Sequence, residues 1–101
     1  MAIVIRTTNL PDEVRNGRHD TVAAELDLAG DPPVGLLFHM AGDVDGEWTI
    51  TDVWASRADY DRFTEKRLFP ALRKLGFVDP DAPPQARIEE FPVHEYVKPH
   101  E

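Results

Sequence analysis

The clearest hydrophobic pattern in the chain lies between Val34 and Trp54, where two runs rich in β-branched, aliphatic and aromatic residues flank an Asp45-Gly46 pair. Asp-Gly readily adopts the positive φ angles of a two-residue type I′ turn. This stretch therefore predicts a β-hairpin with its turn at Asp45-Gly46.

The turn also predicts the register of the hairpin, because the residues that flank a two-residue turn pair with each other, and each further pair lies one residue farther from the turn on both strands. His39 is expected opposite Asp52, and Leu37 opposite Trp54. A register shifted by one pair would place His39 opposite Ile50 and would leave the two faces unchanged. Side chains alternate between the two faces of a strand, and burial of one face prevents a one-residue slip. One face of the hairpin is therefore expected to carry His39, Trp48, Ile50, Asp52 and Trp54.

A helix is predicted directly after the hairpin. Ser56 is a good N-cap, and Asp59, three residues later, is a short version of the capping-box partner. Tyr60 and Phe63 then recur at helical spacing among charged residues, which is typical of an amphipathic helix with one buried side. Pro70 predicts a kink or a second short helix up to Leu75.

Weaker patterns predict the remaining elements. Gly76 is expected to end the helix in a left-handed conformation, and a loop follows over 79–85. Ala2–Arg6 reads as a first strand, and Pro11–Leu28 as a helix weakened by Gly17. The last strand is expected over Ala86–Val97, with its internal proline at a sheet edge or a bulge.

The element order is therefore β-α-β-β-α-β in a single domain over residues 1–101. Short connections and right-handed crossovers then predict a ferredoxin-like α+β sandwich, with one antiparallel sheet and both helices on one face.

Two helices cover only one face of a sheet, yet the hairpin is apolar on both faces. Leu36, Phe38 and Met40 alternate with the residues expected to face the helices. Exposing such a patch to water is costly. We therefore expect two sheets to meet face to face in a homodimer.

Composition and charge narrow the possible functions. The chain has 42% hydrophobic and 30% charged residues, which is globular composition. A net charge of −8 argues against a nucleic-acid or anionic membrane partner. The chain has no cysteine, its longest apolar run is far shorter than the roughly 20 residues of a membrane span, and no signal-peptide pattern is present at its start. A cytoplasmic location is the expectation.

The segment GLLFHMAG…GEWTITDVWASRADYDRFTEKRLFPALRKLGF, about residues 34–77, resembles the dimeric α+β barrel superfamily, in particular the small proteins related to antibiotic-biosynthesis monooxygenases. Trp54 matches the tryptophan that ends a strand in this pattern, Ser56 matches the serine cap, and Phe63 the helix aromatic. The resemblance implies a ferredoxin-like fold that pairs into a dimeric barrel, and a pocket lined by Trp54. Members include cofactor-independent oxygenases, haem-degrading enzymes, cyclases and isomerases.

His39 and Asp52 are the candidate catalytic residues. Histidine titrates near neutrality, and a carboxylate across the ladder orients the ring and favours its charged form, as a general base requires. The alternative interpretation is a cross-strand ion pair that only satisfies two polar groups. No third residue with a catalytic role stands out in the sequence.

The candidate substrate-binding residues are Trp54, Ile50, Leu37, Tyr60 and Phe63. Large aromatic side chains are equally typical of a small hydrophobic core. The four histidines show no metal-ligand spacing, and no glycine-rich phosphate loop is present, so no metal or cofactor is expected.

These patterns favour a homodimer that binds a small molecule. If the protein is an enzyme, the expected reaction is that of a cofactor-independent monooxygenase, cyclase or isomerase on an aromatic or polyketide-like substrate. The alternative is a non-catalytic ligand-binding or assembly module. Haem binding is a third interpretation, although the sequence shows no clearly placed axial histidine.

Overall fold

The computed structural model describes residues 1–10, 14–77, 86–95 and 97. It contains four strands, β1 (Ile3–Thr8), β2 (Leu36–Val44), β3 (Glu47–Trp54) and β4 (Arg87–Pro92). The helical segments are η1 (Val14–Arg18), α1 (His19–Leu26), α2 (Arg57–Phe63), η2 (Thr64–Leu68) and α3 (Phe69–Lys74), of which η1 and η2 are π-helical.

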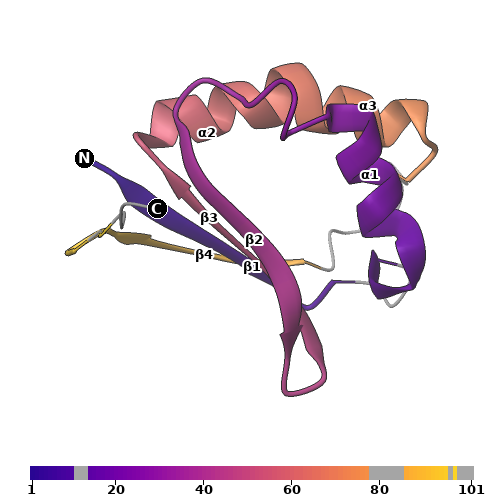
Figure 1. Ribbon diagram of the computed structural model, residues 1–101, viewed down its shortest axis with the longest axis horizontal. Coiled ribbons are helices and arrows are strands. Elements are labelled where there is room, and N and C mark those ends of the chain that lie inside the picture. The colour runs from indigo at the N-terminus through magenta and orange to yellow at the C-terminus, as the bar shows by residue number, and fades with distance from the viewer. Residues whose placement is uncertain (11–13, 78–85, 96, 98–101) are drawn as a thin grey trace.

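The strands form one antiparallel sheet in the order β2-β3-β1-β4, and the helices lie together on one face of it (Figure 1). This confirms the expected ferredoxin-like α+β sandwich. Within the described ranges, no helix is long and apolar enough to cross a lipid bilayer.

The hairpin has the predicted turn and pairing. Asp45 and Gly46 have φ angles of +51° and +86°, as a type I′ turn requires. The Asp43 carboxylate accepts a 2.7 Å hydrogen bond from the backbone N–H of Gly46, which holds the turn closed. His39 pairs with Asp52, as expected.

The expected pairing of Leu37 with Trp54 is wrong. A β-bulge between Leu36 and Phe38 adds one residue to β2, so Leu36 is the residue that pairs with Trp54. Leu36 packs against the core, whereas Leu37 is 43% exposed. The bulge lies before His39 in the strand, so it leaves the His39–Asp52 pairing unchanged.

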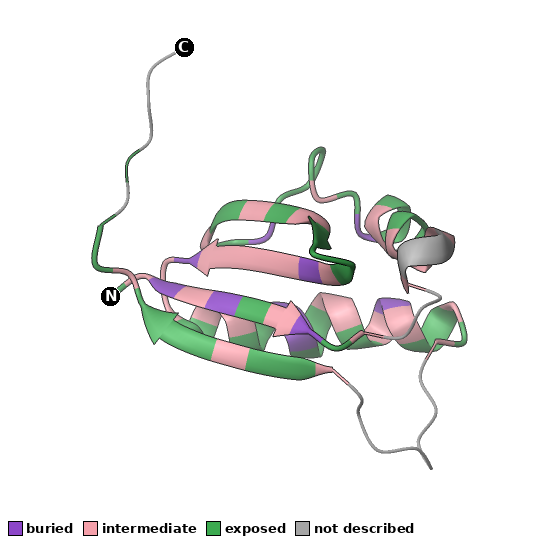
Figure 2. Cartoon of the chain, turned by 90° about the horizontal axis from the view of Figure 1, so that it is seen from below, coloured by how far each residue is buried: buried purple, intermediate pink, exposed green. Residues whose placement is uncertain are grey.

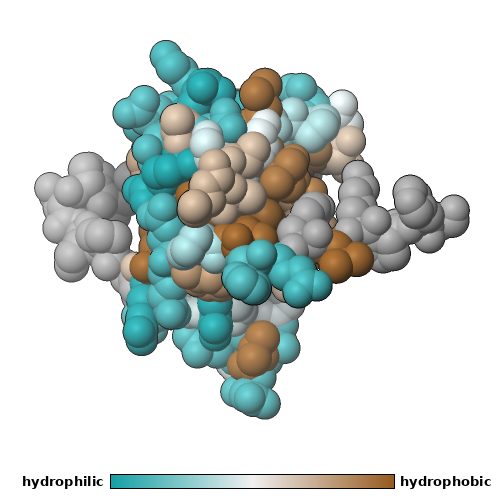
Figure 3. All heavy atoms as spheres, turned by 90° about the vertical axis from the view of Figure 1, so that its left-hand side faces the viewer, coloured by the Kyte–Doolittle hydropathy of each residue, from teal (hydrophilic) through white to brown (hydrophobic). Residues whose placement is uncertain are grey.

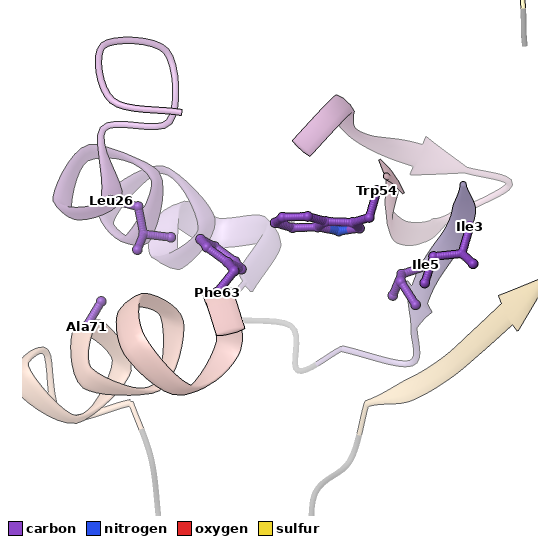
Figure 4. Close-up of a cluster of buried hydrophobic side chains, with 6 residues drawn as sticks. All are labelled: Ile3, Ile5, Leu26, Trp54, Phe63 and Ala71. Carbon is purple, nitrogen blue, oxygen red and sulfur yellow. The ribbon is translucent and has the colours of Figure 1, made fainter. Parts of the chain in front are cut away.

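The core lies between the sheet and the helices, around Trp54, which is 1% exposed (Figure 4). The indole lies between Phe63 of α2 and the isoleucines of β1, with 5.3 Å between the Trp54 and Phe63 ring centroids. Burying a tryptophan removes a large apolar area from water, so this contact joins the two layers. The buried cluster comprises Ile3, Ile5, Leu26, Trp54, Phe63 and Ala71.

The second helical segment begins and ends as predicted. The Ser56 hydroxyl accepts a 3.2 Å hydrogen bond from the Asp59 N–H and donates a 2.9 Å bond to the Asp59 carboxylate. At the other end, Gly76 has a φ of +74°, and the N–H groups of Gly76 and Phe77 bond back to Arg73 and Leu72 in a Schellman arrangement.

The chain continues helically past Pro70. The π-helical turn η2 precedes α3, in which Pro70 occupies the first turn. Proline cannot donate a backbone hydrogen bond, and its ring crowds the carbonyl four residues earlier. The wider turn of a π-helix accommodates both effects, and a second short helix then follows, as one of the two expected alternatives.

The first helix is shorter than predicted. Residues 11–13, where it was expected to begin, lie outside the described residues, and regular α-helix is present only from His19. Gly17 has a φ of +118°, far from helical values, which explains the irregular turn before His19. Asp27, at φ +49°, ends α1 in a left-handed conformation before the predicted Leu28.

The face of the sheet opposite the helices is uncovered. β4 is an edge strand and ends at Pro92, shorter than the expected Ala86–Val97. Figure 2 looks onto the uncovered face, where β2 and β4 are largely exposed. The strand register aligns one apolar row across all four strands of this face, namely Phe38, Val53, Val4 and Phe91.

We expect Ser56→Ala to lower the free energy of unfolding by about 1 kcal/mol, because it removes the N-cap of α2. Ser56→Asn, which retains a capping oxygen, should remain close to the wild type in urea denaturation. Equal losses in both variants would show that the cap does not stabilise the helix.

Candidate functional site

The hairpin positions His39 and Asp52 beneath the helices. Asp52 lies two residues before Trp54 on β3, so both side chains point to the helix-covered face. Asp52 also pairs with Ile5 of β1, whose side chain lies in the core. His39 joins this face from the neighbouring strand through its pairing with Asp52.

His39 and Asp52 form a short hydrogen bond, with 2.5 Å between Nδ1 and Oδ1. The side chains are 27% and 16% exposed, respectively, so solvent screens the pair only partly. The hydrogen bond to Asp52 raises the pKa of His39 above its ordinary value of 6.5, although burial of the ring opposes the rise. Because Nδ1 faces the carboxylate, Nε2 is the nitrogen available for exchanging a proton with a ligand.

A second histidine, which was not predicted as a site residue, lies against His39. The His19 ring from α1 is parallel to the His39 ring within 3°, with 6.2 Å between centroids. The Trp48 indole of β3 meets His19 edge-on at 5.5 Å. The sequence contained a signal for this position, because His19 precedes Val22 by three residues and Leu26 by seven, and so shares their helical stripe.

The aromatic candidates also come together. Trp54 contacts Tyr60 edge-to-face at 5.9 Å and Phe63 at 5.3 Å. Burial raises the pKa of Tyr60, with the Arg57 guanidinium opposing the rise, so the phenol stays protonated at neutral pH and can donate a hydrogen bond. The Nε1 atoms of Trp48 and Trp54 are buried, and neither has an acceptor among the described residues.

Ile50 and Leu37 have different positions. Ile50 is half-buried on β3, pairs with Ala41 and Thr7, and has the same parity as Asp52 and Trp54. Leu37, moved out of register by the bulge, does not join this group. The structure thus brings His39 and Asp52 together with His19 and Trp48 beside them, and it brings Trp54 together with Tyr60 and Phe63.

A separate pocket of about 390 Å³ lies between the end of α1 and the α3 region. Its charged side chains are already paired. Lys74 bonds to Glu25 at 2.6 Å, and Arg67 donates a 2.7 Å hydrogen bond to the Leu26 carbonyl while also lying 3.5 Å from Asp31. The side chains that line the pocket thus pair with each other where α1 packs near α3.

The described site holds one imidazole and one carboxylate that contact each other. Across the described part of the chain, no group of three or more His, Asp or Glu side chains is arranged to hold a metal ion. One imidazole oriented by one carboxylate can accept and donate a proton, and the neighbouring aromatic rings provide apolar surface for a planar molecule.

Comparisons with known proteins support the fold. No protein-family model and no curated protein sequence match the chain. Among solved structures, a protein of unknown function from Nitrosomonas europaea matches with a TM-score of 0.65 and 16% identity, over 99% of this chain and 95% of that one.

Two further structures carry functional names. The heme-degrader MhuD from Mycobacterium tuberculosis, solved with two hemes bound, has a TM-score of 0.62 and 17% identity, over 97% of this chain and 100% of its own. A candidate antibiotic biosynthesis monooxygenase from Deinococcus radiodurans has a TM-score of 0.59 and 16% identity, over the full length of both chains. These matches confirm the fold that the resemblance of residues 34–77 implied, and at such identities they show the fold alone.

We expect the His39–Asp52 pair to stabilise the protein in a pH-dependent way. A pKa that is raised on folding contributes stability that is fully present below pH 6.5 and lost as the pH rises through the folded-state value. The stability lost in His39→Gln, on the order of 1 kcal/mol, should therefore be largest below pH 6.5 and shrink at alkaline pH. Thermal unfolding across this range measures it, with His94→Gln, at an exposed position after β4, as the control. A difference independent of pH would contradict the ion pair.

Proposed function

We propose that the protein binds a small planar molecule, aromatic or polyketide-like, between its sheet and its helices, and that His39 exchanges a proton with it. The observation that carries this proposal is the His39–Asp52 hydrogen bond, which is partly buried on the face that also holds Trp54. An oriented imidazole beside aromatic side chains is an arrangement suited to acid–base chemistry on an apolar ligand.

The geometry of the His39–Asp52 pair decides which ring nitrogen exchanges a proton with the ligand. The Asp52 carboxylate accepts the Nδ1 proton of His39 and so directs the lone pair of the neutral ring to Nε2. The Asp52 hydrogen bond raises the pKa of His39, which makes the neutral imidazole a stronger base. Nε2 can then remove a proton from a phenol or from an activated carbon.

The resulting phenolate or carbanion is electron-rich. It can react with dioxygen, close a ring or take its proton back at another carbon, and these correspond to oxygenation, cyclisation and isomerisation. None of these first steps needs a bound cofactor. A general base accelerates a reaction by about 10²–10⁴-fold, so binding and orientation must supply the rest of the rate enhancement.

The buried indole of Trp54 supports a ligand at this place. An unpaired buried donor costs roughly 1–3 kcal/mol, and the Trp54 N–H has no acceptor in the described part of the chain. A ligand oxygen that reached Nε1 would recover this energy. Tyr60, which remains a phenol at neutral pH, offers a second donor nearby.

The packing of the aromatic residues favours the alternative of a module without chemistry. Trp54 and Phe63 are 1% and 9% exposed, and they contact each other as core residues do. In that case His39 and Asp52 only satisfy each other between the layers. Because one of the solved neighbours is a heme-degrader with two hemes bound, haem is also a ligand to test.

Native mass spectrometry of freshly purified protein tests the proposal. We expect a co-purifying aromatic compound, and we expect His39→Gln to lower kcat with that compound by about 10²–10⁴ while His94→Gln leaves it unchanged. An unchanged kcat in His39→Gln would refute the base. A Soret shift on titration with haemin would instead favour haem binding.

We also propose that the uncovered sheet face pairs with a second copy of the chain. The row of Phe38, Val53, Val4 and Phe91 crosses the whole sheet, and Phe38 and Phe91 are each 48% exposed. Figure 3 shows the end of the molecule where β3 leads into α2, with apolar atoms near the middle and hydrophilic atoms mainly along one side. A continuous apolar face of this kind is typical of an interface, and a two-fold axis allows the same row to cover itself.

Light scattering at micromolar concentration should therefore give the mass of a dimer for the wild type. We expect Phe38→Asp to give the monomer mass, because it places a charge at the edge of the apolar row. Val34→Asp, at a 75% exposed position before β2, is the matched control and should remain dimeric. A monomeric wild type would refute this pairing.

A further inference from the structure

The two histidines beneath the helices form a pair of similar units. His39 on β2 has Asp52 at 2.5 Å from its Nδ1, and His19 on α1 has Asp20 at 3.4 Å from its Nδ1. The rings are parallel within 3° and their centroids are 6.2 Å apart. The short Asp52 contact holds the proton of neutral His39 on Nδ1, whereas Asp20 is 91% exposed and its longer contact leaves His19 free to carry its proton on Nε2.

Trp48 adds a third donor to this group. Its indole contacts the His19 ring edge-on at 5.5 Å, and its buried N–H has no acceptor among the residues that the structure describes. An indole can only donate a hydrogen bond, His39 donates from Nε2 once it has taken up the ligand proton, and His19 donates from Nε2 in the tautomer that leaves Nδ1 unprotonated. His39, His19 and Trp48 are thus a local concentration of N–H donors in a chain with a net charge of −8.

We propose that His19 and Trp48 extend the His39 site into an oxyanion subsite, which holds the ligand as a phenolate or enolate. This inference rests on the proposed function of His39. The ligand class is a planar phenol or enol of near-neutral acidity, and the subsite discriminates against molecules of similar shape that have no ionisable oxygen.

The proton balance of the binding step is simple. The ligand O–H bond breaks, its proton moves to Nε2 of His39, and the electron pair stays on the ligand oxygen. The product is an ion pair of imidazolium and oxyanion, which a second donor from His19 stabilises because charge-assisted hydrogen bonds are stronger than neutral ones. The ligand thus becomes electron-rich before any later step.

The groups that face this pair set its dependence on pH. They are Asp52 from β3, Asp20 beside His19 on α1, and the Tyr60 phenol of α2, whose ionisation senses the charge of Asp52. The Asp52 hydrogen bond favours the charged form of the His39 imidazole, and a bound oxyanion favours it further. Phenolate binding and protonation of His39 are therefore expected to be coupled.

4-Nitrophenol is a suitable probe, because its phenolate absorbs visible light and the neutral phenol does not. We expect the wild-type protein to bind the phenolate in preference to the phenol, so that bound probe ionises at lower pH than free probe. His19→Gln should weaken phenolate binding about tenfold and should leave the binding of 4-nitroanisole, which cannot ionise, within twofold of the wild type. Trp48→Phe should weaken phenolate binding by a smaller factor.

Two further variants separate charge from shape. His19→Lys places a cationic N–H donor on the same helical stripe and should recover much of the phenolate preference, while His94→Gln should match the wild type throughout. Circular dichroism of each variant shows whether it is folded. If a variant is unfolded at the assay temperature, probe binding to His19→Lys and to His94→Gln is compared at a lower temperature.

The outcomes distinguish this inference from the proposed function. If His39→Gln abolishes binding of the probe and His19→Gln changes nothing, the oxyanion subsite is overturned and the His39 site stands. If 4-nitrophenol and 4-nitroanisole bind the wild type equally, the preference for an oxyanion is overturned. If neither probe binds and no His39 variant alters any binding, both proposals fail.

Discussion

The structure depends on the register of the β2–β3 hairpin. Because side chains alternate along a strand, the pairing of His39 with Asp52 assigns every other side chain of β3 to one face of the sheet. Trp54 therefore lies under the helices and joins the layers through Phe63. The same alternation sends Phe38 and Val53 to the uncovered face, so core, candidate site and apolar surface all follow from one pairing.

The candidate site shares its supports with the core. Asp52 lies two residues from Trp54 and opposite Ile5, both of which are almost completely buried. The carboxylate thus sits beside rigid, close-packed side chains, which limits its motion and orients His39. His19 reaches the same place from α1 because Leu26, two turns further along the same stripe of that helix, is anchored in the cluster. The candidate site and the core are therefore supported by the same contacts.

Local patterns were sufficient for much of the fold. The Asp45-Gly46 turn, the Ser56 cap and the left-handed Gly76 were all predicted correctly, because each depends on the conformational preference of one or two residues. The bulge after Leu36 was missed, since its extra residue leaves no local signature, and the expected pairing of Leu37 with Trp54 was therefore wrong. The short α1 was missed because Gly17 was treated as a weak position within a helix and not as a break.

By itself, the sequence determined the element order, the turn and the opposition of His39 and Asp52, because these depend on spacing along one hairpin. Only the tertiary structure decided which other side chains meet them. His19 comes from a helix twenty residues away, and its approach depends on how α1 packs over the sheet. Contacts between distant segments are set by burial of the whole core, and no local pattern of residues encodes the resulting distances.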